Sequence, residues 1–314
     1  MLGFLHIRKS QSLPEQPPRA QLRALIESVR ATPYYRKHEI ALTWVDLASP
    51  PAQRASLEEW LAGFPLVDAR AFLDAPEMFC NPTAPRMSAR AFRYPWDQLP
   101  RTAVLCPASQ DPTPGASSGL TRAAGWLRVR PGSQFAAFKE SFQVRLVHQG
   151  EWSRLAKLRP DVLAGPLPLL RGLAAQVLAG VLEPPPLKLA VVAFTGPRDG
   201  LLSEADRDEL WKAFQVPVRA KLHGFHRELL AWECEAQEGL HLEPGSAIVE
   251  TIAGSQELAI TCLDNFECPC LRVRIGLAAE LSSMPCPCGR PGDRLLNLRA
   301  PVEALAARAA CAAD

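Results

Sequence analysis

Four metal-ligating side chains in the second half of the chain have types and spacing that suit a metal ion. Two are cysteines separated by a single proline and followed by glycine, so one tight turn can hold both thiolates together. The other two, a cysteine and a histidine, come from a separate segment. The four residues are Cys234, His241, Cys286 and Cys288. Because zinc favours four sulfur or nitrogen ligands in a tetrahedron, the set predicts a closed structural zinc site without a catalytic role.

The alternative interpretation is that these are ordinary buried thiols and a surface histidine, since cysteine often serves as a small core residue. Against it, the proline and glycine around Cys286 and Cys288 make a poor core segment. A metal that joined two distant segments would stabilise the folded chain. A second pair, Cys268 and Cys270, lies in an apolar, strand-like stretch. We interpret it as packed core thiols, with metal binding or redox chemistry as the alternatives.

The composition is that of an ordinary globular protein. Apolar residues make up 47% of the 314 residues, and 35 Lys and Arg balance 33 Asp and Glu. This balance predicts no strong attraction to nucleic acid or to an anionic membrane. The sequence shows neither a signal peptide nor an apolar run long enough to span a bilayer, so we expect a cytoplasmic protein with no membrane partner.

The elements that must position these residues follow from hydrophobic periodicity. Apolar residues at helical spacing predict an amphipathic helix over 19–30, and Asp68 is a plausible N-cap of a further helix. Ser203 and Asp206 have the spacing of a capping box. Further expected helices cover 135–147, 169–182 and 203–214, and expected buried strands cover 161–165 and 187–194.

The order strand, helix, strand, helix indicates a parallel sheet with helical crossovers. After residue 222 the character changes. Short alternating runs at 247–252 and 257–263 predict a smaller, more antiparallel subdomain. An alanine-rich helix is expected near the end of the chain.

Six segments, taken in order, resemble phenylacetate-CoA ligase and its relatives among the AMP-forming acyl-adenylate ligases. Each is weakly similar by itself, but their order and spacing together are fairly specific. The segments are 32–36 (TPYYR), 64–69 (FPLVDA), 160–166 (PDVLAGP), 232–241 (WECEAQEGLH), 271–276 (LRVRIG) and 286–290 (CPCGR). The resemblance implies the α/β fold of the N-terminal large domain of these ligases, with a mainly parallel sheet core and a smaller β-rich subdomain. It also implies a comparable metal-ligand set at the four zinc positions.

The resemblance further implies an ATP/AMP cleft with magnesium. The positions that match its phosphate loop are Ser117, Ser118, Gly119 and Thr121. The positions that match the nucleotide turns and the paired arginines are Thr195, Gly196, His223, Gly224 and Arg272. We assign these nine residues as candidate cofactor-binding residues, and we assign no catalytic residue.

Several positions depart from the family pattern. The phosphate loop lacks its second glycine and its lysine, with Arg122 where the glycine would let backbone approach phosphate. The turn that should carry the magnesium-binding carboxylate reads HGFHR, with Arg227 at the acidic position and Glu228 one residue later. The aspartate that should hold the ribose falls at Leu277, which cannot accept a hydrogen bond. The C-terminal lid domain with its lysine is also expected to be missing.

These departures predict a divergent ligase-like protein that is impaired or inactive in adenylation and still binds a nucleotide, acyl or CoA-like ligand. The alternatives are a non-catalytic accessory or scaffold protein with a protein partner, an active enzyme whose lid is supplied in trans, and a different enzyme that reuses the cleft through His223 and His226. The expected division is 1–105 for an N-terminal helical and α/β part, 106–222 for a nucleotide-cleft-like α/β subdomain, 223–300 for a β-rich subdomain with zinc, and 301–314 for a helical tail.

Overall fold

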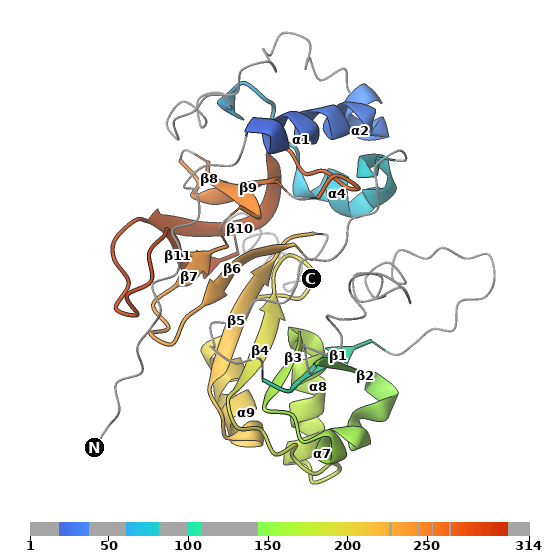
Figure 1. Cartoon of the computed structure of the whole chain (residues 1–314), viewed down its shortest axis with the longest axis vertical. Coiled ribbons are helices and arrows are strands. Elements are labelled where there is room, and N and C mark those ends of the chain that lie inside the picture. The colour runs from blue at the N-terminus through green and yellow to red at the C-terminus, as the bar shows by residue number, and fades with distance from the viewer. Residues whose placement is uncertain are drawn as a thin grey trace, which may run out of the picture.

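A computed structural model describes residues 19–37, 61–81, 100–107, 144–225, 228–243, 245–252, 254–263 and 265–300. Within these ranges the strands form one 11-stranded sheet of order β2-β1-β3-β4-β5-β6-β7-β11-β10-β9-β8. Figure 1 shows the sheet running through the molecule, with helices at its β1–β5 end and a second group of helices beyond β8–β10. The mixed α/β class predicted from the sequence is confirmed.

The first half of the sheet is parallel. Its strands are β1 (Thr102–Cys106), β2 (Val144–His148), β3 (Val162–Pro166), β4 (Ala190–Thr195) and β5 (Val218–His223). Their neighbours pair in parallel register, for example Val192 with Arg219. β1 and β4 are buried along their whole length, which is why they read as continuous apolar runs. β1 extends across the expected boundary between residues 105 and 106.

Helices cover one face of this parallel half. They are η3 (Gln149–Arg154), α7 (Leu155–Leu158), α8 (Leu167–Leu178) and α9 (Glu204–Phe214). Leu170 and Leu173 of α8 pack with Leu210 of α9 and with Val191 of β4 in one apolar cluster. These helices therefore support β4 and β5 from one face of the sheet. The packing fixes the positions of the carboxyl ends of the two strands relative to each other.

The start of α9 confirms the predicted capping box. Ser203 Oγ accepts from the backbone N–H of Asp206, and an Asp206 carboxylate oxygen accepts from the N–H of Ser203 at 2.9 Å. Arg171 of α8 donates to both carboxylate oxygens of Asp206, at 2.5 and 2.8 Å. This pair joins the two helices, and it lowers the pKa of Asp206 to about 2, an effect that the hydrogen bonds from Ser203 reinforce.

The second half of the sheet is antiparallel, as the sequence predicted for the region after residue 222. Its strands are β6 (Leu229–Glu233), β7 (Leu240–Leu242), β8 (Ala247–Thr251), β9 (Glu257–Cys262), β10 (Val273–Ser282) and β11 (Arg294–Arg299). The direction changes between β5 and β6, where Leu222 faces Ala231. The chain crosses this half so that β7 lies between β6 and β11.

An N-terminal layer packs on the antiparallel half. It consists of α1 (Arg19–Ala31), α2 (Pro33–Lys37), α4 (Ala69–Asp74) and η1 (Pro76–Phe79). The predicted helix over 19–30 is confirmed, and the backbone N–H of Arg70 donates to the Asp68 side chain, which confirms that N-cap. Phe79 stacks on Tyr34 and contacts Phe72, and Phe72 stacks on Phe225 at 5.2 Å. These aromatic contacts connect the N-terminal layer to Phe225, which lies in the turn after β5.

The predicted helix over 135–147 is wrong in its last four residues, which are the part of it that the structure describes. The sequence predicted helix to residue 147, but residues 144–148 form β2, which pairs with β1 at the edge of the sheet. The side chains of β2 alternate only partly between buried and exposed, so hydrophobic periodicity does not predict this strand. Pairing with β1 stabilises it instead. The expected helices over 135–143 and near the C-terminus lie outside the described residues. None of the helices in the described ranges has the length and apolar character that a membrane span requires.

Candidate functional site

The four predicted metal ligands come together in the structure. The ligand atoms of Cys234, His241, Cys286 and Cys288 all lie within 4.8 Å of one another. The Sγ atoms of Cys234 and Cys286 are 3.7 Å apart, and Cys288 Sγ lies 3.4 Å from His241 Nε2. Zn–S bonds of about 2.3 Å and Zn–N bonds of about 2.0–2.1 Å in a tetrahedron place sulfurs about 3.8 Å apart and sulfur about 3.5 Å from nitrogen. The side chains therefore fit a tetrahedral metal ion.

Sheet pairing explains why these distant residues meet. Cys234 follows β6 directly, and His241 lies in β7, where it pairs with Trp232 of β6 and with Arg294 of β11. The other two cysteines lie in the turn that joins β10 to β11, which closes through a hydrogen bond from the N–H of Gly289 to the carbonyl of Cys286 at 2.9 Å. Gly289 has φ +75°, a conformation that glycine adopts without strain.

Three side chains to which the sequence analysis assigned no role pack around this turn: Arg294, Trp232 and Arg290. Arg294, with a side chain 5% exposed, donates to the carbonyls of Glu238, Met284 and Pro285. The ring of Trp232 stacks on the ring of His241 with centroids 5.3 Å apart, and the guanidinium of Arg290 lies over the Trp232 ring. Within the described part of the chain, His241 Nδ1 has no hydrogen-bond partner. Stacking on Trp232 and the contact of Nε2 with Cys288 thus orient the imidazole.

The pKa values of the cluster shift in both directions. Burial raises the pKa of Cys234 to about 11. Burial also pushes the pKa of Cys288 upward, but hydrogen bonds with the Arg290 backbone and the neighbouring thiols outweigh it, so that pKa lies below its ordinary value. Burial, and then the charges of Arg294 and Arg290, lower the pKa of His241. The imidazole is therefore neutral at pH 7, which is the form that binds metals.

The structure brings four of the candidate cleft residues together at the carboxyl ends of β4 and β5. Thr195 pairs with Leu222, and its hydroxyl donates to the carbonyl of Lys221 at 3.1 Å. A Cβ at Gly196 would collide with the carbonyl oxygen of His223, and Gly196 has φ +143°, so only glycine fits there. Gly224 follows directly. Open α/β sheets place ligands at this edge of their parallel strands.

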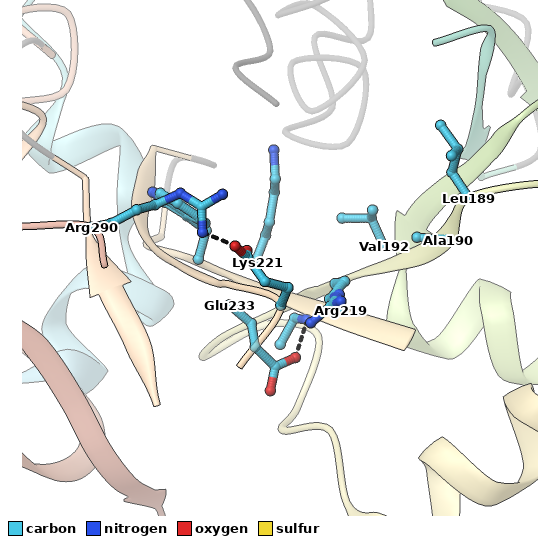
Figure 2. A pocket seen from close by; sticks show the side chains of 10 residues that line it. Leu189, Ala190, Val192, Arg219, Lys221, Glu233 and Arg290 are labelled. Carbon is cyan, nitrogen blue, oxygen red and sulfur yellow. Dashed lines mark hydrogen bonds and ion pairs between the residues drawn. The ribbon is translucent and has the colours of Figure 1, made fainter. Parts of the chain in front are cut away.

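Two hollows adjoin this region and share Ala220 and Glu233 in their walls. The larger, of about 560 Å³, includes Thr195 together with residues of α9, β7 and β11. The smaller, of about 260 Å³, lies between β4, β5 and the turn that holds Cys286 and Cys288. Figure 2 shows Lys221 rising from β5 into the smaller hollow, while Glu233 lies on the opposite side of the strand. Burial lowers the pKa of Lys221 to about 8, although the charge of Glu243 opposes it.

Glu233 connects the two candidate sites. Its carboxylate accepts from both terminal nitrogens of Arg207 in α9, at 3.2 and 2.7 Å, and from the backbone N–H of Ala220 in β5 at 2.9 Å. The next residue is the metal-ligand candidate Cys234, whose carbonyl accepts from Arg219. No local pattern in the sequence predicts this network, because its members are separated by a helix and a strand crossover.

The partners of Arg272 belong to β8 and to the segment before α4. Its guanidinium forms an ion pair with Glu250 at 3.1 Å and donates to the carbonyls of Ala62 and Phe64. These groups, rather than Thr195 or His223, hold the guanidinium, so Arg272 fastens the N-terminal layer to β8. Its cofactor-binding role remains a prediction. Ser117, Ser118, Gly119, Thr121 and His226 lie outside the described residues.

The second Cys-x-Cys pair is buried, as expected of core thiols, but its two sulfurs face different neighbours. Cys268 Sγ lies 2.7 Å from Cys80 Sγ at the end of η1. Cys270 belongs to a separate group with Cys262 and Glu228, whose ligand atoms lie within 4.8 Å of one another. The sequence analysis had recognised neither contact.

Comparisons with known proteins show what the fold is similar to. No family model matches the chain, and no match was found among curated proteins. Among solved structures, an open conformation of 2-hydroxyisobutyryl-CoA ligase in complex with 2-HIB-AMP and CoA aligns with TM-score 0.59 and 15% identity, covering 91% of this chain and 69% of that chain. The same ligase in the postadenylation state with R3-HIB-AMP aligns with TM-score 0.59 and 16% identity, covering 91% and 67%. At such identity the likeness shows the fold, which is that of the N-terminal domain of adenylate-forming ligases.

Proposed function

We propose that this protein is a divergent, phenylacetate-CoA ligase-like relative of the AMP-forming CoA ligases that binds a nucleotide, acyl or CoA-like ligand but does not adenylate carboxylates by itself. The proposed ligand site is the carboxyl edge of β4 and β5, around Thr195, Gly196, His223 and Gly224. The observation that carries the proposal is the environment of the two positions that should supply anionic anchors for ribose and magnesium.

The ribose position is apolar. Leu277, which takes the place of the family aspartate, is 5% exposed and packs in the large core cluster of the antiparallel half. A leucine offers no acceptor for a ribose hydroxyl, and burial in the core prevents a neighbouring water from replacing it.

The carboxylate nearest the magnesium position is engaged elsewhere. Glu228 turns back over Gly224, where a Cβ would collide with its carboxylate, and its Oε1 accepts a hydrogen bond from Cys262 Sγ at 3.3 Å. Magnesium binds through oxygen ligands that project toward the substrate phosphates. A carboxylate folded onto a thiol does not serve that purpose.

The proposal includes a structural zinc ion in the Cys234, His241, Cys286 and Cys288 cluster. Four protein ligands leave no position for water or substrate, so the ion would stabilise the fold and take no part in a reaction. Its place between β6, β7 and the β10–β11 turn supports that role. The preference for zinc over other metals rests on the three thiolates and the imidazole.

Two measurements on the purified chain test the proposed function. ATP–pyrophosphate exchange with a panel of aryl and fatty acids should show no activity above a sample without carboxylic acid. Calorimetric titration with AMP, CoA and acyl-CoA should detect binding of at least one of them. A His223→Ala variant should weaken that binding, and a matched change at the half-buried His148, in the edge strand β2, should leave it unchanged.

The outcomes separate the alternatives. Exchange by the isolated chain would refute the proposed loss of adenylation. Absence of binding to every compound would refute the ligand site and favour an accessory or scaffold role. Exchange that arises only when a free-standing lid domain is added would favour an active enzyme completed in trans.

A further inference from the structure

A second cluster of metal-ligating side chains lies next to the proposed ligand site. It consists of Glu228 directly before β6, Cys262 at the end of β9 and Cys270 shortly before β10, with ligand atoms within 4.8 Å of one another. Both cysteines are fully buried, at 0% exposure. A partly exposed carboxylate that meets two fully buried thiols is an uncommon arrangement, because apolar side chains usually fill the positions beside buried groups.

The measured spacing suits a borderline divalent cation. Cys262 Sγ and Glu228 Oε1 are 3.3 Å apart. Zn–S and Zn–O bonds of about 2.3 and 2.0–2.2 Å in a tetrahedron place sulfur about 3.5 Å from oxygen. Two thiolates select zinc-like ions over magnesium or calcium, which prefer oxygen ligands throughout.

The backbone holds the three ligands in place from three segments. The N–H of Cys262 donates to the carbonyl of Cys270 at 2.9 Å, which ties the two cysteines to each other directly. The N–H of Gly224 donates to the carbonyl of Glu228 at 2.9 Å. Gly224 lacks the Cβ that would occupy the place of the Glu228 carboxylate, so the glycine makes room for the third ligand.

The cluster adjoins the carboxyl edge of the parallel strands. Glu228 contacts Gly224, which follows His223, and the His223 ring packs edge-on against Phe194 at 4.9 Å. Three protein ligands leave one tetrahedral position open, which is the arrangement of metal sites that contact water or substrate. Glu228 is the partly exposed member of the three, so the cluster lies nearest to solvent on its Glu228 side.

We propose that Glu228, Cys262 and Cys270 form a second zinc-type site, three-liganded and distinct from the closed four-ligand cluster, with its open position available to water or to an oxygen of a bound molecule. The site stands whether or not the cleft binds a nucleotide, since it rests only on these three side chains and the backbone that positions them.

Metal stoichiometry tests the proposal on the full chain. Protein purified with zinc in the buffers, freed of loosely held ions by gel filtration and analysed by mass spectrometry of its metals, should contain two equivalents. Glu228→Gln and Cys270→Ser should each contain one, and Cys286→Ser should also contain one. The matched control is Cys106→Ser, at a buried thiol of β1 outside both clusters, which should retain two.

Cobalt titration of the unaltered protein provides a test that does not depend on variants folding. Two cobalt ions should bind, each giving thiolate-to-cobalt absorbance, and the Glu228→Gln protein should lose the contribution of one. A wild-type content of one equivalent that Cys286→Ser abolishes would overturn the second site. Two equivalents retained by folded Glu228→Gln and Cys270→Ser proteins would overturn it as well, because the second ion would then be bound elsewhere.

Discussion

Replacing Asp206 by asparagine should remove a measurable part of the stability of the parallel half. Arg171 donates to both carboxylate oxygens, and the pKa of Asp206 falls from 3.8 to about 2. That difference corresponds to about 2.4 kcal/mol in favour of the charged form in the folded state. The Arg171 side chain is 44% exposed, so solvent screens the pair and the expected loss is about 1–2 kcal/mol.

The pH dependence has a definite sign. Because the folded-state pKa lies below the unfolded one, the stabilisation is complete above pH 3.8, falls as the pH drops toward 2, and is absent below that. Urea unfolding of the wild type and of Asp206→Asn should therefore differ most near pH 7 and converge as the solution is acidified below pH 4. The control is Asp208→Asn, at an exposed position two residues along α9, with an expected change under about 0.5 kcal/mol. A difference between wild type and Asp206→Asn that does not shrink on acidification would refute the electrostatic reasoning.

Three further predictions concern the residues that shape the two candidate sites. Gly196→Ala should cost about 1–3 kcal/mol in urea unfolding, because φ is +143° and the new Cβ meets a carbonyl, whereas Gly200→Ala, with φ +81° and open space around it, should cost less. Glu233→Gln should cost about 2–3 kcal/mol of unfolding free energy, because it leaves the largely buried Arg207 without its carboxylate partner. Glu204→Gln is the control, since Glu204 pairs with the same arginine but its side chain is 92% exposed, and it should change stability by under about 0.5 kcal/mol. Equal effects of the two changes would show that burial does not decide the strength of the pair. A strong zinc chelator should lower the melting temperature of the wild type by more than that of Cys286→Ser, which keeps only the ion of the three-ligand cluster, and a wild type indifferent to the chelator would argue against a structural ion.

Local signals in the sequence account for the parts of the structure that could be predicted. The capping box of α9 needs only Ser203 and Asp206, three residues apart, and the structure confirms it. The buried strand β4 is recognisable because all its residues are apolar or small and lie between turns. The Cys-x-Cys turn indicated two metal ligands that the same turn would bring together, and the structure places all four predicted ligands in one cluster.

Long-range pairing decided what the sequence could not show. β2 was predicted as helix because its strand character comes from β1 beside it. Arg272 was predicted as a cofactor-binding residue, and that role stays a prediction; the partners that the structure shows for it, Glu250 and the carbonyls of Ala62 and Phe64, belong to segments with no spacing relation to it. The Glu228, Cys262 and Cys270 cluster gathers three separate segments, and no local pattern relates a glutamate after β5 to cysteines near β10.

The two candidate metal-binding clusters lie at different places in the sheet order. The four-ligand cluster ties β6, β7 and the β10–β11 turn; β7 pairs with both β6 and β11, so an ion there reinforces contacts between neighbouring strands of the sheet. The three-ligand cluster joins the start of β6 to the end of β9, which lie four strands apart in the sheet order. An ion in that second cluster would close the antiparallel half across strands that do not pair. Occupancy of the three-ligand cluster should therefore change the packing of the turn after β5 more than occupancy of the four-ligand cluster does, and hydrogen exchange of residues 223–225 and 228–230 with one or two equivalents of zinc would measure that difference.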